Sequence, residues 1–259
     1  MENCLEDGLN NTFRRMSAAN WTNRPFLNSL VVKRTHSEVI DGPFKGMKIL
    51  EDCKWGDGDI SSKLLGIYEN ELYSSVEDAI SRQPDKIINV GCAEGFYGVG
   101  LARRLPSVPV VFIDIDRDSI EIARRNVRLN GVTEDRCQFL TESSQSSIKS
   151  LAAACARPFI VMDCEGAEAT LMESPSGYEN SIILVETHDF AVPDIRKTLM
   201  ERFSASHRIT EIKQGAKNPY LPVIDDFPDI SKMLIACENR PQTMYWLYML
   251  PKHMVSKYY

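Results

Sequence analysis

The sequence predicts an α/β fold, with helices on both faces of a doubly wound, mostly parallel sheet of seven strands whose last strand is antiparallel. From residue 86 onward, short apolar runs alternate with helical patterns, which is typical of consecutive βαβ units. The apolar runs are continuous, so the strands are expected to be buried on both faces. Residues that begin and end helices also stand at the expected places between these runs.

Each element of this fold follows from a local pattern. Strands are expected at residues 87–90, 108–113, 137–140, 159–162, 181–185, 208–213 and 244–250. Helices are expected at residues 71–80, 96–105, 117–129, 148–156, 167–172 and 193–203. Asp116 is a suitable N-cap for one helix, and Pro193 fits the first turn of another. The final run is expected to return antiparallel to the strand before it.

The first 84 residues follow a different pattern, and we expect them to form a cap or lid on a core made of residues 85–259. Residues 10–28 are polar and rich in turn formers, and residues 39–50 suggest two short strands around an Asp-Gly turn. An insertion into the core is expected at about residues 214–242. The cap and the insertion are the segments expected to form an acceptor pocket.

Composition and charge limit the classes of function. The chain has 30 Lys and Arg against 36 Asp and Glu, and this formal charge of −6 argues against an electrostatically held nucleic acid. Seven cysteines are scattered without a Cys-x-x-Cys pair, which argues against a zinc knuckle and favours reduced thiols. The apolar run at 244–250 is far shorter than the ~20 residues of a membrane helix. We therefore expect a cytoplasmic protein with no membrane partner.

A glycine-rich loop follows the first core strand and is the first candidate for a binding site. Gly91 permits a tight turn and the close approach of a ligand, and Gly95 lets the next helix start nearby. Asp114 follows the second strand, where a carboxylate can accept hydrogen bonds from both hydroxyls of a ribose. A tight βα turn and a helix N-cap remain the alternatives for the loop and for Asp114.

The loop also carries an acidic residue, which discriminates between cofactors. Glu94 would repel a pyrophosphate, because a pyrophosphate site depends on amide donors and a helix N-terminus. A sulfonium with an amino-acid tail meets no such repulsion. Glu94 therefore favours S-adenosylmethionine (SAM), with S-adenosylhomocysteine (SAH) as its product, over a nicotinamide dinucleotide.

Two motifs at the carboxyl ends of later strands suggest a family. They are Asp163-Cys164-Glu165-Gly166-Ala167-Glu168 and Glu186-Thr187-His188, and Gly66-Ile67-Tyr68-Glu69 precedes the core. With the glycine loop and Asp114, these segments resemble the class I SAM-dependent methyltransferases, and within them the FkbM-like methyltransferases. The resemblance covers residues 41–251 and implies the Rossmann-like methyltransferase fold.

The resemblance also implies a set of cofactor contacts around the loop and the strand ends. Asn89 stands where such enzymes usually have an acidic residue, so a charge that would attract the sulfonium is missing. Glu142 or Ser143 would lie near the adenine, and Asp163 near the methionine part. The predicted cofactor-binding set is Asn89, Gly91, Cys92, Ala93, Glu94, Gly95, Phe96, Asp114, Ile115, Glu142, Ser143 and Asp163.

Methyl transfer to a hydroxyl requires alignment, a dry pocket and a base. The predicted catalytic residues are Asp163, Glu165 and His188, since they follow two strands that should be neighbours. The same three side chains are also plausible ligands of a divalent ion, but a metal is the less favoured interpretation and none is predicted. Tyr68, Glu69 and Glu71 are candidates for a lid, with a solvated helix start as the alternative.

The sequence therefore predicts an enzyme, a SAM-dependent methyltransferase that methylates a hydroxyl of a small molecule or sugar. One alternative is methylation of RNA or protein. Another is a SAM-binding protein without turnover, which the unusual Asn89 would favour. A nicotinamide-dependent enzyme is the most distant alternative.

Overall fold

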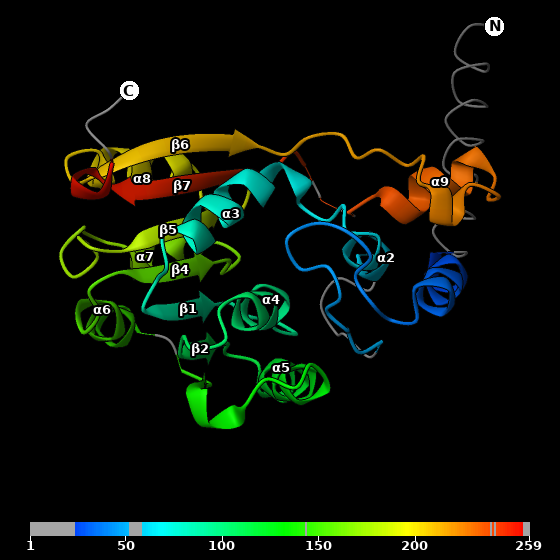
Figure 1. Cartoon of the computed structure of the whole chain (residues 1–259). Coiled ribbons are helices and arrows are strands. Elements are labelled where there is room, and N and C mark those ends of the chain that lie inside the picture. Colours follow the sequence, from blue (N-terminus) through cyan, green and yellow to red (C-terminus); the bar gives the residue numbers. More distant parts are fainter. Residues whose placement is uncertain (1–23, 52–58, 143, 239, 241, 256–259) are drawn as a thin grey trace, which may run out of the picture.

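The computed structural model describes residues 24–51, 59–142, 144–238, 240 and 242–255 (Figure 1). Its centre is a seven-stranded sheet with strand order β3-β2-β1-β4-β5-β7-β6. The strands are β1 (Lys86–Val90), β2 (Val110–Ile113), β3 (Cys137–Leu140), β4 (Pro158–Met162), β5 (Ile182–Thr187), β6 (His207–Lys213) and β7 (Tyr245–Pro251). Strands β1 to β5 pair in parallel, while β7 is antiparallel to both β5 and β6. The predicted fold class is confirmed.

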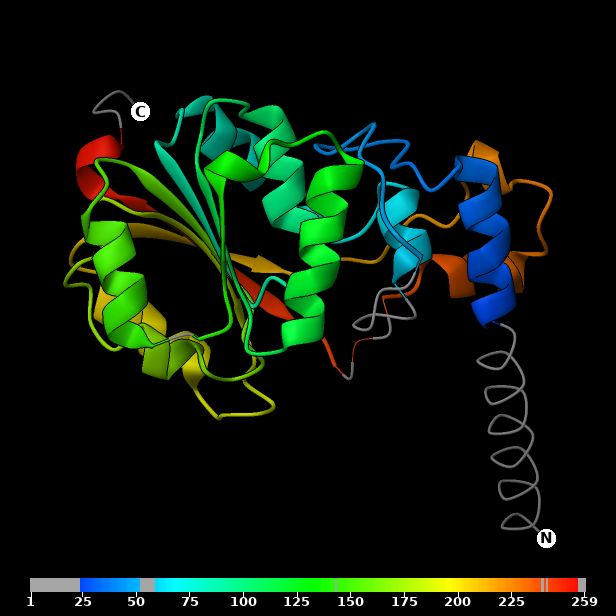
Figure 2. The same ribbon diagram turned by 90° about the horizontal axis from the view of Figure 1, so that it is seen from below.

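Helices cover both faces of the sheet. The helices that cover it are α3 (Tyr73–Ser81), α4 (Phe96–Arg104), α5 (Arg117–Leu129), α6 (Gln145–Ala153), α7 (Glu168–Leu171) and α8 (Ile195–Phe203), whereas α2 (Ile60–Leu64) and α9 (Asp229–Ala236) lie beside the sheet (Figure 1). Figure 2 shows α5 and α6 on opposite sides of the sheet. One buried cluster joins the sheet to α3, α4 and α5, and a second joins it to α6, α7 and α8. The inner strands β1, β2, β4 and β5 are thus buried on both faces, as expected from their apolar runs, whereas the edge strands β3 and β6 are partly exposed.

The strand order reverses between β1 and its two neighbours. The chain leaves β1 for β2 on one side, and it later returns to β4 on the other side. In a doubly wound sheet, this reversal opens a crevice beyond the carboxyl ends of the strands. The fold therefore directs the loops after β1, β2 and β4 to a single place.

The N-terminal segment packs beside the insertion that precedes β7. Residues 24–35 form a helix, and Figure 2 shows this helix, in blue, alongside α9. Arg34 forms an ion pair with Asp226 at 2.5 Å, and Asn28 accepts a hydrogen bond from Ser61 at 2.6 Å. Val31 belongs to the same buried cluster as the core strands. The N-terminal helix and the insertion, which are far apart in sequence, therefore lie side by side.

Three local predictions need correction. Residues 39–50 do not form paired strands, and only one bridge joins Glu38 to Lys48, because the chain turns twice, at Gly42 and at Gly46. Helix α8 begins at Ile195 rather than at Pro193, because Asp194 has a left-handed φ of 62°. Of the predicted turn-rich stretch at 10–28, residues 24–28 are helical and the rest lies outside the described residues.

The expected N-cap at Asp116 is present in the structure. The side chain of Asp116 accepts a hydrogen bond from the backbone of Asp118, as predicted for the N-cap of α5. Among the described residues, no helix is long and apolar enough to cross a bilayer.

Candidate active site

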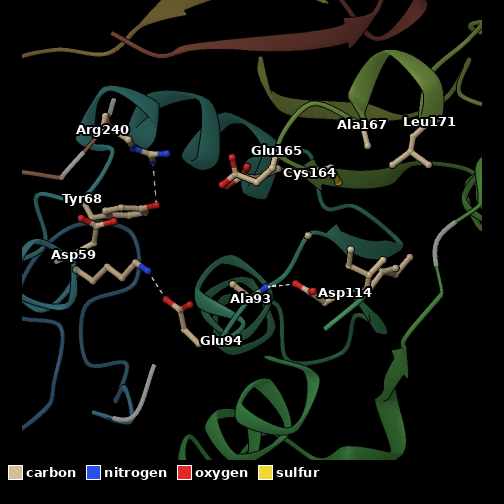
Figure 3. Close-up of a pocket in the computed structure, with 15 residues that line it drawn as sticks. Asp59, Tyr68, Ala93, Glu94, Asp114, Cys164, Glu165, Ala167, Leu171 and Arg240 are labelled. Atoms are coloured by element: carbon tan, nitrogen blue, oxygen red, sulfur yellow. Dashed lines mark hydrogen bonds and ion pairs between the residues drawn. The ribbon is translucent and has the colours of Figure 1, made fainter. Parts of the chain in front are cut away.

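A pocket of about 300 Å³ lies at the carboxyl ends of β1, β2 and β4 (Figure 3). Its lining residues are Asp59, Lys63, Tyr68, Gly91, Ala93, Glu94, Ile113, Asp114, Ile115, Asp163, Cys164, Glu165, Ala167, Leu171 and Arg240. Residues from the loops after β1, β2 and β4 form one side, which we call the core wall (Gly91, Ala93, Glu94, Asp114, Asp163 and Glu165). Residues from outside the core strands form the other, which we call the outer wall (Asp59, Lys63, Tyr68 and Arg240).

The core wall depends on one glycine and one carboxylate. Gly91 has a φ of 67°, and a Cβ there would lie 1.6 Å from the carbonyl oxygen of Asp163, so a larger residue does not fit. Asp114 accepts a hydrogen bond from the backbone of Ala93 at 2.8 Å and another from Asp116 at 2.9 Å. Asp114 thus joins the loop after β1 to the start of α5, at the edge of the pocket.

Several predicted cofactor residues lie behind the pocket rather than on its wall. Asn89 is buried, and its side-chain oxygen accepts a hydrogen bond from the backbone of Gly98 at 2.9 Å. Phe96 packs edge-on against the rings of Phe44 and Tyr68. Cys92 and Gly95 also do not line the pocket, and nor does Glu142. Ser143 lies outside the described residues.

The outer wall brings buried charges to the pocket. Lys63 forms an ion pair with Glu94, and its ammonium group lies 4.7 Å from the centre of the Tyr68 ring. Burial raises the pKa of Asp59 to about 6, although Lys63 and Arg240 lower it. The ion pair of Lys63 with Glu94 joins residues that are 31 positions apart, and no local motif indicates Asp59 or Lys63.

Arg240 links three side chains at the top of the pocket. It donates a hydrogen bond to the hydroxyl of Tyr68 at 3.1 Å, and it forms ion pairs with Glu69 and, at 3.1 Å, with Glu186. Burial raises the pKa of Glu69 to about 7 against the opposing effect of Arg240. Burial also raises the pKa of Glu186, and the charge of Asp163 adds to this shift.

The three predicted lid residues occupy different environments. Tyr68 lines the pocket, whereas Glu69 is buried and also accepts a hydrogen bond from the hydroxyl of Tyr97. Glu71 forms an ion pair with Lys217 and does not line the pocket. Only Tyr68 of the three is therefore in a position to contact a ligand there.

Four carboxylates surround His188 at the ends of β4 and β5. The Nδ1 atom of His188 lies 2.8 Å from Glu168, which also accepts hydrogen bonds from the backbone of Cys164 at 3.0 Å and of Gly166 at 3.3 Å. The Nε2 atom lies 3.5 Å from Asp163, 3.3 Å from Glu165 and 3.6 Å from Glu186. The predicted catalytic residues are thus neighbours, together with two further acids.

Burial and the nearby negative charges shift the pKa of His188 in opposite directions. Burial alone would lower the pKa of His188, but Glu168 and Asp163 outweigh it, and the net shift is upward. The His188 side chain is only 1% exposed and does not line the pocket. Glu165 is 61% exposed, lines the pocket and has a left-handed φ of 51°. Such backbone strain in a residue other than glycine is concentrated at functional sites.

Comparisons with known proteins agree on one class of enzyme. A family model described as a methyltransferase domain matches residues 82–217, which is more than half of the chain. The release factor glutamine methyltransferase of Chlorobaculum tepidum is 33% identical over 116 residues, or 42% of this chain and 38% of that protein. The ribosomal RNA small subunit methyltransferase C of Stutzerimonas stutzeri is 26% identical over 95 residues, or 37% of this chain and 26% of that protein. The matched regions thus span well under half of these relatives.

Two of the matched solved structures are described as O-methyltransferases, each with a TM-score below 0.5. The O-methyltransferase from Bacillus cereus has a TM-score of 0.48 and 14% identity, with coverage of 86% of this chain and 89% of that one. A putative O-methyltransferase from Klebsiella pneumoniae has a TM-score of 0.47 and 14% identity, with coverage of 86% and 90%.

The chain belongs to the methyltransferase domain family. Residues 82–217 are therefore a SAM-dependent methyltransferase domain, and the predictions of the enzyme class and of its cofactor are confirmed at the level of this domain. The pocket fits such a cofactor chemically, because it lies at the strand-order reversal and its core wall carries carboxylates that suit ribose hydroxyls and a cationic sulfonium.

Proposed function

We propose that the chain transfers a methyl group to a hydroxyl of a small molecule or sugar, as an FkbM-like methyltransferase. The observation that supports this most is an exposed carboxylate, Glu165, on the pocket wall beside Asp163 and in contact with the buried His188. A hydroxyl acceptor needs a base, whereas many other nucleophiles do not. The FkbM-like assignment rests on the two motifs that meet around His188.

The cofactor is proposed to lie along the core wall. Gly91 and Ala93 would allow its close approach, and Glu94 would interact with the ammonium group of its amino-acid tail. Asp114 would accept hydrogen bonds from the ribose, and Ile115, whose side chain is 80% exposed at the pocket, would pack on the adenine. Asn89, Cys92, Gly95 and Phe96 would act indirectly by holding the loop and the start of α4.

When bound, the cofactor supplies an electrophilic methyl group on sulfur, which transfers by in-line displacement as the S–CH₃ bond breaks and an O–CH₃ bond forms. The residues of this chain have three tasks in that step. Asp163 orients the acceptor, the outer wall excludes water, and Glu165 accepts the hydroxyl proton. His188 acts as a positioning residue, because Glu168 fixes its ring and its Nε2 contacts both Asp163 and Glu165.

The proposed domain organisation assigns the acceptor side to the cap and the insertion. In this proposal residues 1–84 form the cap of a core at 85–259, with the insertion at about 214–242. The cap supplies Asp59, Lys63 and Tyr68 to the pocket, and the insertion supplies Arg240. Tyr68 is the member of the predicted lid that would contact the acceptor.

Methyl transfer from labelled SAM to a panel of hydroxylated small molecules and sugars tests this function. We expect labelled O-methyl product, and we expect the Glu165→Gln variant to bind SAH while losing at least 100-fold in rate, which is a typical contribution of a general base. Glu201→Gln, on the exposed surface of α8, is the matched control and should retain full activity. An unchanged rate in Glu165→Gln would contradict the assigned role.

The second candidate is methylation of a macromolecule. The two relatives that act on a release factor and on ribosomal RNA by description support it. The charge of −6 counts against RNA. Incubation of a cell extract with labelled SAM separates the candidates, since label in protein or RNA would replace the small-molecule proposal. Binding of SAM without transfer to any fraction would instead favour a protein without turnover.

A further inference from the structure

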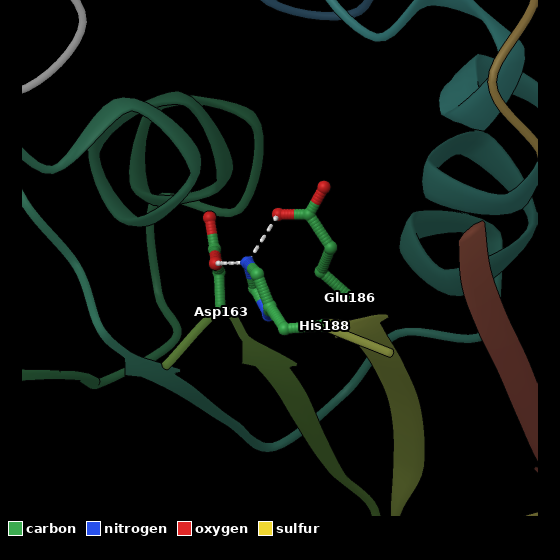
Figure 4. A group of neighbouring side chains, drawn as sticks. All are labelled: Asp163, Glu186 and His188. Atoms are coloured by element: carbon green, nitrogen blue, oxygen red, sulfur yellow. Dashed lines mark ion pairs between the residues drawn. The ribbon is translucent and has the colours of Figure 1, made fainter. Parts of the chain in front are cut away.

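We propose that Asp163, Glu186 and His188 bind a divalent cation at the acceptor side of the pocket (Figure 4). The sheet itself brings these residues together. In the parallel pair of β4 and β5, Met162 is the partner of Val185, so the next residues, Asp163 and Glu186, lie side by side at the strand ends. His188 follows two residues later. One ligand atom from each side chain lies within 4.8 Å of the other two.

The distances suit coordination better than direct hydrogen bonding. The Nε2 atom of His188 lies 3.5 Å from the Oδ1 of Asp163 and 3.6 Å from the Oε2 of Glu186. Both separations exceed the usual length of an N–H···O hydrogen bond. Metal–ligand bonds of about 2.1 Å place neighbouring ligands of an octahedron about 3.0 Å apart and opposite ligands about 4.2 Å apart. The observed separations fall between these two values.

The imidazole is oriented in the way that metal-binding histidines are. Its Nδ1 atom contacts Glu168 at 2.8 Å, and Glu168 is held in turn by the backbone of Cys164 and Gly166. A carboxylate on one ring nitrogen directs the other nitrogen to the metal and raises its basicity. Here that other nitrogen, Nε2, belongs to a side chain that is 1% exposed and faces Asp163 and Glu186.

A second observation indicates a missing partner at the same place. The Oδ1 atom of Asp163, which faces Nε2, is buried and has no hydrogen-bond partner in the described part of the chain, and an unpaired buried carboxylate oxygen is costly. Arg240 contacts Glu186 at 3.1 Å on Oε1 and at 3.3 Å on Oε2, the oxygen that also faces Nε2. Arg240 also pairs with Glu69, so this one guanidinium serves two of the five carboxylates that gather here. They are Glu69, Asp163, Glu165, Glu168 and Glu186.

The donor set also restricts the kind of ion. Two carboxylates and one imidazole suit Mn²⁺ or Fe²⁺ better than Ca²⁺, which favours oxygen ligands alone, or a structural Zn²⁺ site, which is commonly rich in thiolates. The remaining coordination positions would face the pocket, which Asp163 lines. A hydroxyl bound there would have a lowered pKa and would give up its proton more readily. This catalytic consequence rests on the proposed function, whereas cation binding does not.

Mn²⁺ binding to the chelator-treated, dialysed full chain tests the site, with the free ion measured by electron paramagnetic resonance. We expect one Mn²⁺ per chain. We also expect at least a tenfold loss of affinity in each of Asp163→Asn, Glu186→Gln and His188→Gln, and a loss of 10- to 100-fold in Glu168→Gln, as for other metal-orienting partners. Glu134→Gln, in an exposed ion pair with Arg128, is the matched control and should bind Mn²⁺ as the wild type does.

Circular dichroism shows whether each variant is folded, and the conclusion is drawn from at least one folded ligand variant. No Mn²⁺ binding to the wild type at millimolar concentration would overturn the inference. Equal affinity in the wild type and a folded ligand variant would overturn it as well. The Mn²⁺ experiment and the methylation experiment test the two proposals independently. Mn²⁺ binding without O-methylation would refute only the function, and O-methylation by a chain that binds no Mn²⁺ would refute only the cation site.

Discussion

The two walls of the pocket are built by different means. The core wall consists of short loops at strand ends, and its contacts are local to the sheet, such as the hydrogen bond between Ala93 and Asp114. The outer wall consists of buried charges that pair across long sequence distances, such as Arg240 with Glu69 and Lys63 with Glu94. The core wall is therefore fixed by backbone geometry, and the outer wall by electrostatic balance. The two walls should respond differently to substitution and to pH.

The largest effect is expected at the core wall, in Gly91→Ala. The added Cβ would collide with the carbonyl oxygen of Asp163, and alanine disfavours the φ of 67°, so we expect a loss of about 5 kcal/mol or more in the free energy of unfolding. Gly131→Ala is the control, since its φ of 63° is similar and nothing lies within 4 Å of its Cβ. That control should lose only about 1 kcal/mol in urea unfolding. Equal losses in both variants would show that the positive φ, rather than the collision with Asp163, determines the loss of stability.

The second-largest loss of stability is expected at the outer wall, in Arg240→Met. Removal of the guanidinium leaves Glu69 and Glu186 buried without their cation, which typically costs about 3 to 5 kcal/mol. We expect a smaller loss at pH 5 than at pH 8, because the raised pKa values of the two acids let them protonate. Urea unfolding of the wild type and the variant at both values of pH measures this loss of stability. The exposed pair of Arg34 with Asp226 is the control, and Arg34→Met should cost about 1 kcal/mol or less.

A smaller, opposite effect is expected in Asp59→Asn. Burial raises the pKa of Asp59 from 3.8 to about 6, so its contribution to stability is fully present below pH 3.8 and is lost as the pH rises through 6. The variant should therefore be more stable than the wild type at pH 7.5, by on the order of 1 to 2 kcal/mol, and equally stable near pH 4. Thermal unfolding across this range checks the sign. A variant that is destabilised at pH 7.5 would show that the attraction of Lys63 outweighs burial.

The smallest effect on stability is expected in Ile115→Ser, at the edge of the core wall. This side chain is 80% exposed, so the free energy of unfolding should change by only about 0.5 kcal/mol or less. The affinity for SAH should nevertheless fall several-fold, because the proposed adenine contact loses apolar area. Leu129→Ser is a control, since Leu129 is also an exposed apolar residue but does not line the pocket. Unchanged affinity in Ile115→Ser would place the adenine elsewhere.

The same contrast explains what the sequence could predict. The sheet, the turn at Gly91, Asp114 and the group around His188 follow from local patterns, since parallel strands end at the same edge. Asp59 and Lys63 could not be predicted, because contacts with distant residues place them at the pocket, such as Arg24 with Asp59 and Glu94 with Lys63. The role of Asn89 was also hidden, since its hydrogen bond to Gly98 appears only when α4 is placed. At residues 39–50 the alternation resembled strands, yet their apolar side chains are buried in the core around two turns.

The central claim is that the core wall binds the cofactor and that Asp114 holds its ribose. Calorimetric titration of SAH into the wild type and into Asp114→Ala tests this claim most directly. We predict one site per chain in the wild type and at least a tenfold weaker site in the variant, because two hydroxyl hydrogen bonds to a carboxylate are lost. Absence of binding to the wild type, or equal binding to a folded Asp114→Ala, would contradict the account.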